Sequence, residues 1–168
     1  PGGRAPRQPL PSLPARLSDA HKGDFGRVLV LAGSVGMSGA PALAAWGALR
    51  AGAGLVTMAV PRSIQPIVAT LCPCATSIGL PETGSGQIEP GAALRELKNR
   101  GLTGYRAAAP PDVLITGMGI GRGESAYARK FWELIDVFRV EAGGPGGAGA
   151  GGVNLLCSRH RQRQKKVK

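Results

Sequence analysis

The segment from Arg27 to Val60 constrains the fold of this chain more than any other part of the sequence. It begins with Arg27–Ala32 (RVLVLA), a nearly continuous apolar run that is typical of a strand buried on both faces of a parallel sheet. A glycine-rich turn, an alanine-rich helical segment at Pro41–Ala51 and a second strand at Leu55–Val60 follow. Strand, helix and strand in this order form a βαβ unit, which joins two parallel strands.

The same alternation continues along the chain. Apolar periodicity and turn residues predict further strands at Ala75–Leu80 and Asp112–Thr116, and helices at Ser63–Leu71, Gly91–Asn99 and Glu124–Phe138. The last helix is the clearest, because its large apolar residues fall at i, i+3, i+4 and i+7 on one face. We therefore expect an α/β fold, with a mostly parallel sheet flanked by helices.

The two ends of the chain differ in composition from its middle. Residues 1–20 contain five prolines, and residues 142–152 contain seven glycines and one proline. Neither segment offers the apolar residues of a core, so both favour flexible structure. We expect a flexible arm at residues 1–17, a folded part at residues 18–139, and a disordered glycine-rich linker and basic tail at residues 140–168.

The net charge of +11 is concentrated in the tail. Residues 158–168 hold six Lys and Arg residues and no acid, which leaves +5 for the first 157 residues. The tail could contact nucleic-acid phosphates, but it has no aromatic residues for base stacking, so a solvated tail is the other interpretation. The three cysteines do not form a disulfide framework, which favours a reducing cytoplasm. No apolar run reaches the roughly 20 residues that a membrane-spanning helix needs.

Two glycine-rich turns are the candidate binding elements. Gly33–Pro41 (GSVGMSGAP) and Gly117–Gly121 (GMGIG) each follow a strand and precede a helix. Free N–H groups at a helix start attract anions such as phosphate, and ligands of open α/β sheets bind at the carboxyl ends of strands. A tight turn that binds nothing has the same composition, and GMGIG is not a dinucleotide fingerprint because Arg122 occupies the position of its last glycine.

Other polar residues allow two interpretations. Lys22 could face a phosphate, and His21 could act as an acid–base group or orient a loop, but both also suit a solvated surface before the first strand. Cys72 and Cys74 have no second pair of ligands at metal-binding spacing, so the sequence predicts no metal site.

Residues 21–61 and the segment DVLITGMGIGRG at residues 112–123 closely resemble the ADP- or ATP-dependent NAD(P)H-hydrate dehydratases, a carbohydrate-kinase-like family. The resemblance runs from Ser18 to Phe138 and implies a ribokinase-like fold. It also implies repair of hydrated nicotinamide nucleotides. A nucleotide donor, ADP or ATP with Mg²⁺, phosphorylates the ring hydroxyl of NADHX or NADPHX, and loss of phosphate restores NADH or NADPH. Its implied partners are small-molecule nucleotides and, in the full-length family, further copies of the enzyme.

The resemblance assigns roles to a few positions only. Six residues match the two turns in which the family binds the hydrated substrate: Ser38, Gly39, Ala40, Gly117, Gly119 and Gly121. Lys22 matches the segment that leads into the first strand, and it is the candidate cofactor-binding residue.

The chain departs from the family pattern after Phe138. Gly152–Leu156 only faintly resembles the family's Asp-Ala-Asp-type motif and lacks both acids, and the Gly-Asp motif that carries the catalytic aspartate is absent. The chain thus resembles the amino-terminal half of such a domain, incomplete at its C-terminal side and joined to an end foreign to the family. We expect no catalytic residue and no dehydratase activity in this chain; a weak nucleotide-binding module is the alternative.

Overall fold

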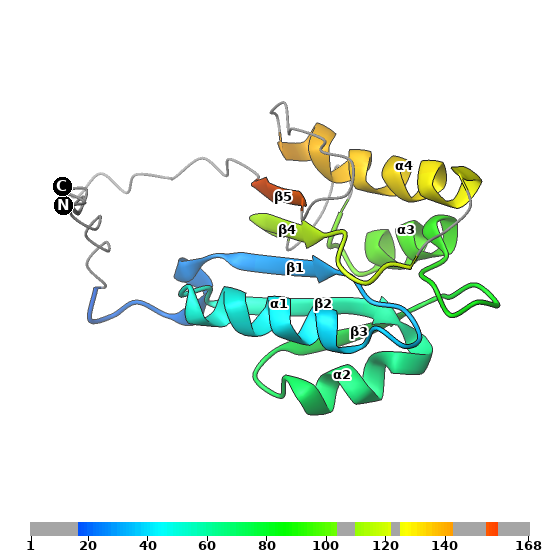
Figure 1. The fold of residues 1–168 in the computed structure, drawn as a ribbon. Helices are drawn as coiled ribbons and strands as arrows, with labels where there is room; N and C mark the ends of the chain where they lie inside the picture. The colour runs from blue at the N-terminus through cyan, green and yellow to red at the C-terminus, as the bar shows by residue number, and fades with distance from the viewer. Residues whose placement is uncertain (1–16, 104–109, 122–124, 143–153, 158–168) are drawn as a thin grey trace, which may run out of the picture.

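One mixed sheet forms the centre of the molecule (Figure 1). The computed structural model describes residues 17–103, 110–121, 125–142 and 154–157. Within these residues the strands are β1 (Arg27–Leu31), β2 (Leu55–Pro61), β3 (Thr76–Leu80), β4 (Val113–Thr116) and β5 (Asn154–Cys157). Their order is β3-β2-β1-β4-β5; the first four are parallel, and β5 pairs with β4 in the antiparallel direction.

Helices cover both faces of this sheet. The helices are α1 (Gly39–Arg50), α2 (Gln65–Leu71), α3 (Pro90–Asn99) and α4 (Ser125–Ala142), with short 3-10 turns η1 (Lys22–Phe25) and η2 (Arg62–Ile64). Helices α1 and α2 lie against one face, and α3 and α4 lie against the other (Figure 1). None of the helices in the described residues is long and apolar enough to cross a membrane.

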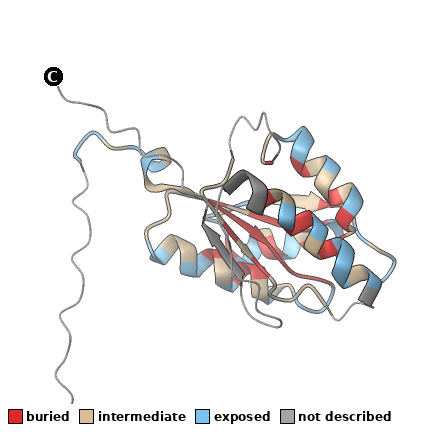
Figure 2. Ribbon diagram, turned by 90° about the horizontal axis from the view of Figure 1, so that it is seen from above, coloured by how far each residue is buried: buried red, intermediate tan, exposed pale blue. Residues whose placement is uncertain are grey.

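Alternate residues of β1 belong to two separate apolar cores. Val28 and Val30 pack with α1 and α2, whereas Leu29 and Leu31 pack with α3 and α4. Because side chains alternate between the faces of a strand, a strand covered on both faces needs a continuous apolar run. The buried residues accordingly concentrate in the strands and on the helix surfaces that face them (Figure 2).

The predicted α/β fold with a mostly parallel sheet is confirmed. The strands and helices predicted between residues 27 and 138 are all present, with ends that differ from the prediction by a few residues. Helix α1 begins at Gly39, two residues before the predicted start. Pro41 therefore lies in the first turn of the helix, where its missing N–H group leaves no hydrogen bond unmade.

The structure describes two short segments of residues 140–168, for which the sequence predicts disorder, as regular secondary structure. Helix α4 continues to Ala142, and Asn154–Cys157 form β5. The free edge of β4 offers unpaired backbone N–H and C=O groups, and pairing with β5 satisfies them. Residues 1–16, 143–153 and 158–168 lie outside the described residues, so the flexible arm, most of the linker and the basic tail remain predictions.

Candidate functional site

Three loops meet at the carboxyl ends of the parallel strands. We call them together the three-loop site: residues 33–40 after β1, residues 83–87 after β3, and residues 117–121 after β4. The first two loops are joined by a hydrogen bond from the Val35 N–H to the Gly86 carbonyl (3.0 Å), and the first and third by one from the Gly33 N–H to the Met118 carbonyl (3.0 Å). Backbone bonds thus hold three segments distant in the sequence together.

Gly119 of the third loop packs against the first loop. It has a φ of +63°, and a Cβ atom at this position would lie 3.0 Å from the Ala40 Cβ and 3.1 Å from the Met37 Cβ. Only glycine combines this left-handed conformation with this close contact at little cost. The structure therefore places Ala40 and Gly119, two of the residues predicted to share a site, directly against each other.

The other predicted residues of these turns lie beside this contact. Gly117 and Gly121 belong to the same short loop as Gly119, and both have positive φ values. Ser38 and Gly39 lie at the start of α1. The structure thus brings all six predicted substrate-site residues to one edge of the sheet, and their role in binding remains a prediction.

The start of α1 presents backbone donors. Ser38 occupies the N-cap position, but its side chain makes no capping hydrogen bond. A Cβ atom at Gly39 would have no heavy atom within 4 Å, so the first turn is open on this side. The uncapped N–H groups and the positive end of the helix dipole favour an anionic group here.

The loop at residues 83–87 was not predicted as part of the site. A Cβ atom at Gly86 would overlap the Val35 side chain, and one at Gly121 would overlap the Gln87 side chain. This loop therefore packs against both glycine-rich turns. Its sequence, Thr-Gly-Ser-Gly-Gln, carries the same glycine signal after a strand, which could have identified it.

Ser34 is a second residue that the sequence did not single out. It is only 2% exposed, and its hydroxyl oxygen has no hydrogen-bond partner among the described residues. A buried hydroxyl without a partner costs about 1–3 kcal/mol. Ser34 lies in the first of the three loops, so this unpaired hydroxyl is enclosed at the carboxyl edge of the sheet.

The three loops contain no titratable side chain. Residues 33–40, 83–87 and 117–121 include no Asp, Glu, His, Lys or Arg. Glu82, just before the second loop, accepts hydrogen bonds from the Ser63 N–H (3.2 Å) and the Ser63 hydroxyl (2.7 Å), which hold its carboxylate in place. The arrangement can bind and orient a ligand through backbone groups, but the loops themselves supply no acid or base.

Lys22 lies at the other edge of the sheet. It is the first residue of η1, which precedes β1, whereas the three loops follow the strands. A strand advances about 3.3 Å per residue, so the five residues of β1 separate the two edges by about 16 Å. The structure does not bring Lys22 to the predicted substrate site. The His21 ring beside it accepts a hydrogen bond from the Gly23 N–H (3.1 Å) within the same short turn.

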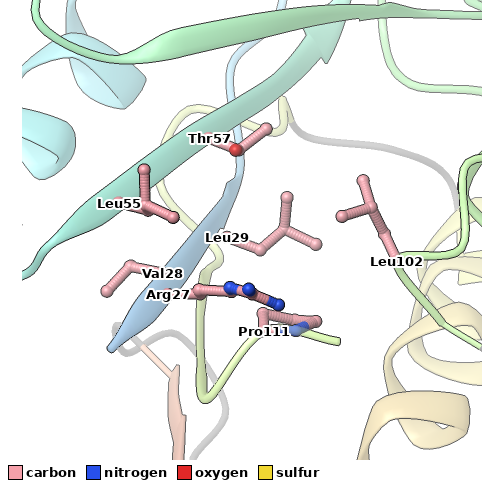
Figure 3. Close-up of a pocket in the computed structure, with 7 residues that line it drawn as sticks. All are labelled: Arg27, Val28, Leu29, Leu55, Thr57, Leu102 and Pro111. Atoms are coloured by element: carbon pink, nitrogen blue, oxygen red, sulfur yellow. The ribbon is translucent and has the colours of Figure 1, made fainter. Parts of the chain in front are cut away.

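A separate cavity of about 250 Å³ opens at this amino edge (Figure 3). Its lining includes Arg27 and Leu29 of β1, Leu55 and Thr57 of β2, and Leu102. None of the predicted site residues lines it. The predicted binding function therefore depends on the three loops and not on this cavity.

The described residues contain no cluster of metal-binding side chains. They contain no group of three His, Cys, Asp or Glu side chains that could hold a metal ion. Cys72 is buried, and burial raises the pKa of its thiol, which favours the unreactive protonated form. The Mg²⁺ ion that the family resemblance implies does not require such a group, because Mg²⁺ usually keeps several waters and binds through one or two carboxylates and the phosphates of a substrate.

Comparison with known sequences identifies related proteins. The family profile described as NAD(P)H-hydrate dehydratase matches residues 28–144. A bifunctional NAD(P)H-hydrate repair enzyme from Moorella thermoacetica is 46% identical over 130 residues, which cover 77% of this chain and 23% of that protein. An ADP-dependent (S)-NAD(P)H-hydrate dehydratase from Xanthomonas campestris is 34% identical over 123 residues, which cover 73% of this chain and 38% of that enzyme. The chain therefore spans well under half the length of these relatives.

Solved structures show the same architecture. The ADP/ATP-dependent NAD(P)H-hydrate dehydratase from Bacillus subtilis, co-crystallized with ATP/Mg²⁺, is 24% identical with a TM-score of 0.52, over 74% of this chain and 37% of that chain. A ribokinase-like superfamily protein from Enterococcus faecalis is 22% identical with a TM-score of 0.50, over 72% of this chain and 36% of that chain. The predicted ribokinase-like fold is confirmed, and the chain covers only part of it.

Proposed function

The chain belongs to the NAD(P)H-hydrate dehydratase family, and on this premise we propose that the three-loop site binds the hydrated nicotinamide nucleotide of a nucleotide-dependent dehydratase. The contact between Ala40 and Gly119 carries the proposal, because it joins the two glycine-rich turns into one surface. This surface lies at the carboxyl edge of the sheet, where α/β proteins bind ligands. The names of the relatives, NAD(P)H-hydrate repair enzymes and dehydratases, support the substrate class.

The proposed reaction removes water from the hydrated ring. ADP or ATP donates a phosphoryl group to the ring hydroxyl, and the phosphate then leaves while the ring loses a proton, so that the ring double bond forms again. Phosphorylation helps because phosphate is a much better leaving group than hydroxide. The ADP-dependent relative supports a nucleotide donor. In this proposal Mg²⁺ accompanies the nucleotide phosphates, which together with waters and one or two carboxylates are its usual ligands.

This chain contributes binding and orientation to that reaction. The open first turn of α1 offers N–H groups to an anionic phosphate, and the loop of Gly117–Gly121 forms the neighbouring wall. The three loops contain no acid or base, so the proton transfers and the stabilisation of the moving phosphoryl group need groups from elsewhere. We therefore expect no dehydration of NADHX by this chain alone, and a rate above the spontaneous one would contradict that expectation.

Isothermal titration calorimetry with NADPH, NADHX and ADP tests the binding site. We expect the chain to bind the nicotinamide nucleotides and the Gly39→Leu variant to bind them at least about tenfold more weakly. A Cβ atom at Gly39 has no heavy atom within 4 Å, so we expect the leucine to leave the fold intact and to cover the N–H groups of α1.

Gly91→Leu is the matched control for this experiment. Gly91 also lies in the first turn of a helix, α3, where an added Cβ makes only ordinary contacts of 3.5 Å or more. The control variant should bind like the unmodified chain. If neither nicotinamide nucleotide binds, or if both variants bind equally well, the three-loop site is not the substrate site.

A further inference from the structure

Hydrogen bonds close the loop at residues 83–87 into a tight turn. The Thr83 N–H donates to the Gln87 carbonyl (2.8 Å), and the Gly86 N–H donates to the Thr83 carbonyl (2.9 Å). The Gln87 N–H also donates to the Thr83 hydroxyl (3.2 Å). These bonds leave the turn little conformational freedom, so it presents the Gln87 side chain from a fixed position.

The hydroxyl groups of the turn also determine which way the Gln87 amide faces. The Ser85 hydroxyl donates a long hydrogen bond to the Gln87 Oε1 atom (3.4 Å). Because a hydroxyl has a single proton, Thr83 is then the donor in the 2.9 Å bond between the Thr83 and Ser85 hydroxyls. The amide oxygen thus has its partner within the turn. The Nε2 group donates to no other residue that the structure describes, and its two protons remain for another acceptor.

The donor end of this amide lies in the three-loop site. A Cβ atom at Gly121 would overlap the Gln87 Nε2 atom, so the amide lies directly against the backbone of the third loop. Gly86, the residue before Gln87, contacts the Val35 side chain of the first loop. Gln87 is only half-buried. An unpaired donor therefore lies where the three loops meet.

Apolar surface borders this donor. Val35 and Met37 of the first loop are large apolar side chains that are 57% and 41% exposed. Val35 packs on Gly86, so it lies beside the turn that carries Gln87. Sites for small molecules combine apolar surface with a few placed polar groups. An exposed apolar side chain next to a fixed N–H donor matches a flat ring that carries a carbonyl substituent.

We propose that Gln87 is a specificity-determining residue, whose Nε2 group donates a hydrogen bond to the carboxamide oxygen of the nicotinamide ring while the ring lies against Val35. This inference rests on the proposed function, because it concerns the ring of the proposed ligand. In the reduced ring, the ring nitrogen feeds electron density through the adjacent double bond into the carboxamide, which makes its oxygen a strong acceptor. A donor that is already in position also loses little conformational entropy when the ligand binds.

Isothermal titration calorimetry with NADH and ADP-ribose tests this contact, because ADP-ribose lacks only the nicotinamide ring. Gln87→Leu removes the donor. Gln87→Glu replaces it with an oxygen at nearly the same size and keeps an oxygen that accepts from Ser85. We expect each variant to raise the dissociation constant for NADH about fivefold or more. Gln87→Leu should change the dissociation constant for ADP-ribose less than about twofold, since the contact involves the ring alone.

Gln65→Leu is the matched control. Gln65 is also a half-buried glutamine whose amide bonds a serine hydroxyl, that of Ser77 (3.1 Å), but it lies outside the three loops. This control should leave both dissociation constants unchanged. Circular dichroism checks that every variant keeps the fold, and the nearly isosteric Gln87→Glu carries the NADH test if Gln87→Leu does not fold.

The outcomes separate this inference from the proposed function. If NADH binds and Gly39→Leu weakens its binding but neither Gln87 variant does, the role of Gln87 is wrong and the proposed function stands. If Gln87→Leu weakens NADH and ADP-ribose equally, the role is also wrong, because the effect then does not involve the ring. If the unmodified chain does not bind NADH, the proposed function fails and this inference fails with it.

Discussion

Replacing Gly119 by alanine tests whether the three loops interlock as described. The substitution has two separate costs. An alanine at φ +63° carries the penalty of left-handed backbone, about 1–2 kcal/mol. Its Cβ also lies 3.0 Å from the Ala40 Cβ and 3.1 Å from the Met37 Cβ, closer than the roughly 3.5–4.0 Å of an ordinary carbon contact, and relieving this adds about 1–2 kcal/mol. We expect Gly119→Ala to lower the free energy of unfolding by about 2–4 kcal/mol.

Two further glycines separate these costs. Gly36 has a φ of +85° and no atom within 4 Å of an added Cβ, so Gly36→Ala carries the backbone penalty alone. Alanine also lowers the conformational entropy of the unfolded chain, which offsets part of this penalty, so the free energy of unfolding should fall by about 1 kcal/mol. Gly39 has neither a left-handed φ nor a close neighbour, and Gly39→Ala should be neutral or slightly stabilising. Urea denaturation followed by circular dichroism measures all three variants against the unmodified chain.

A double-mutant cycle with Ala40→Gly identifies the contact itself. Removing the Ala40 methyl group should recover part of the loss in Gly119→Ala, with a coupling energy of about 0.5–1 kcal/mol. If Gly119→Ala costs no more than Gly36→Ala and shows no coupling to Ala40, the first and third loops do not touch, and the three-loop site is wrong.

Two other substitutions test the packing outside the site. The Tyr127 hydroxyl is buried without a hydrogen-bond partner among the described residues, so Tyr127→Phe should raise the free energy of unfolding near neutral pH by about 1 kcal/mol. Burial and the nearby charge of Glu89 raise the pKa of Tyr127 from 10.0 to about 12. Because the folded state holds the phenol proton more tightly than the unfolded state, this proton stabilises the folded state fully below pH 10, and the stabilisation is lost as the pH rises towards 12. Tyr127→Phe should remove that part of the loss of stability at alkaline pH. Equal slopes of stability against pH in both proteins would contradict this. A Cβ atom at Gly54 would overlap the Lys22 carbonyl oxygen, so Gly54→Ala should lower the free energy of unfolding by about 3 kcal/mol or more. Gly84→Ala is the control and should lower it little, because a Cβ atom at Gly84 meets nothing within 4 Å. Similar urea midpoints for the two variants would show that η1 does not approach Gly54 as described.

The sequence predicted the elements better than the contacts between them. The apolar run at Arg27–Ala32 has a local cause, burial on both faces, and such patterns can be identified without a structure. Strand β5 has no such pattern, because its pairing depends on the free edge of β4 and not on its own four residues. Edge pairing of this kind is a tertiary effect, and glycine-rich flanks at residues 142–152 obscure it further.

The candidate site shows the same limit. Ala40 and Gly119 were predicted to share a site because each lies after a parallel strand, and sheet topology brings such positions to one edge. Lys22 lies before its strand, so the same topology places it at the opposite edge, despite its position close to the first turn in the sequence. The loop at residues 83–87 also carries glycines after a strand, but no local pattern specifies that Gly86 contacts Val35 and Gln87 contacts Gly121.

Left-handed glycines link the stability of this edge to its ability to bind. Six of the nine positive-φ glycines in the described residues belong to the three loops: Gly33, Gly36, Gly86, Gly117, Gly119 and Gly121. Where such a glycine also touches a neighbouring loop, as Gly119 does, a substitution disturbs the fold and the binding surface together, and a loss of binding there has two explanations. Gly39 has no close neighbour and an ordinary backbone conformation, so a side chain at this position changes the surface alone. Binding measured on Gly39 variants therefore reports on the site, and stability measured on Gly119 variants reports on the contact that forms it.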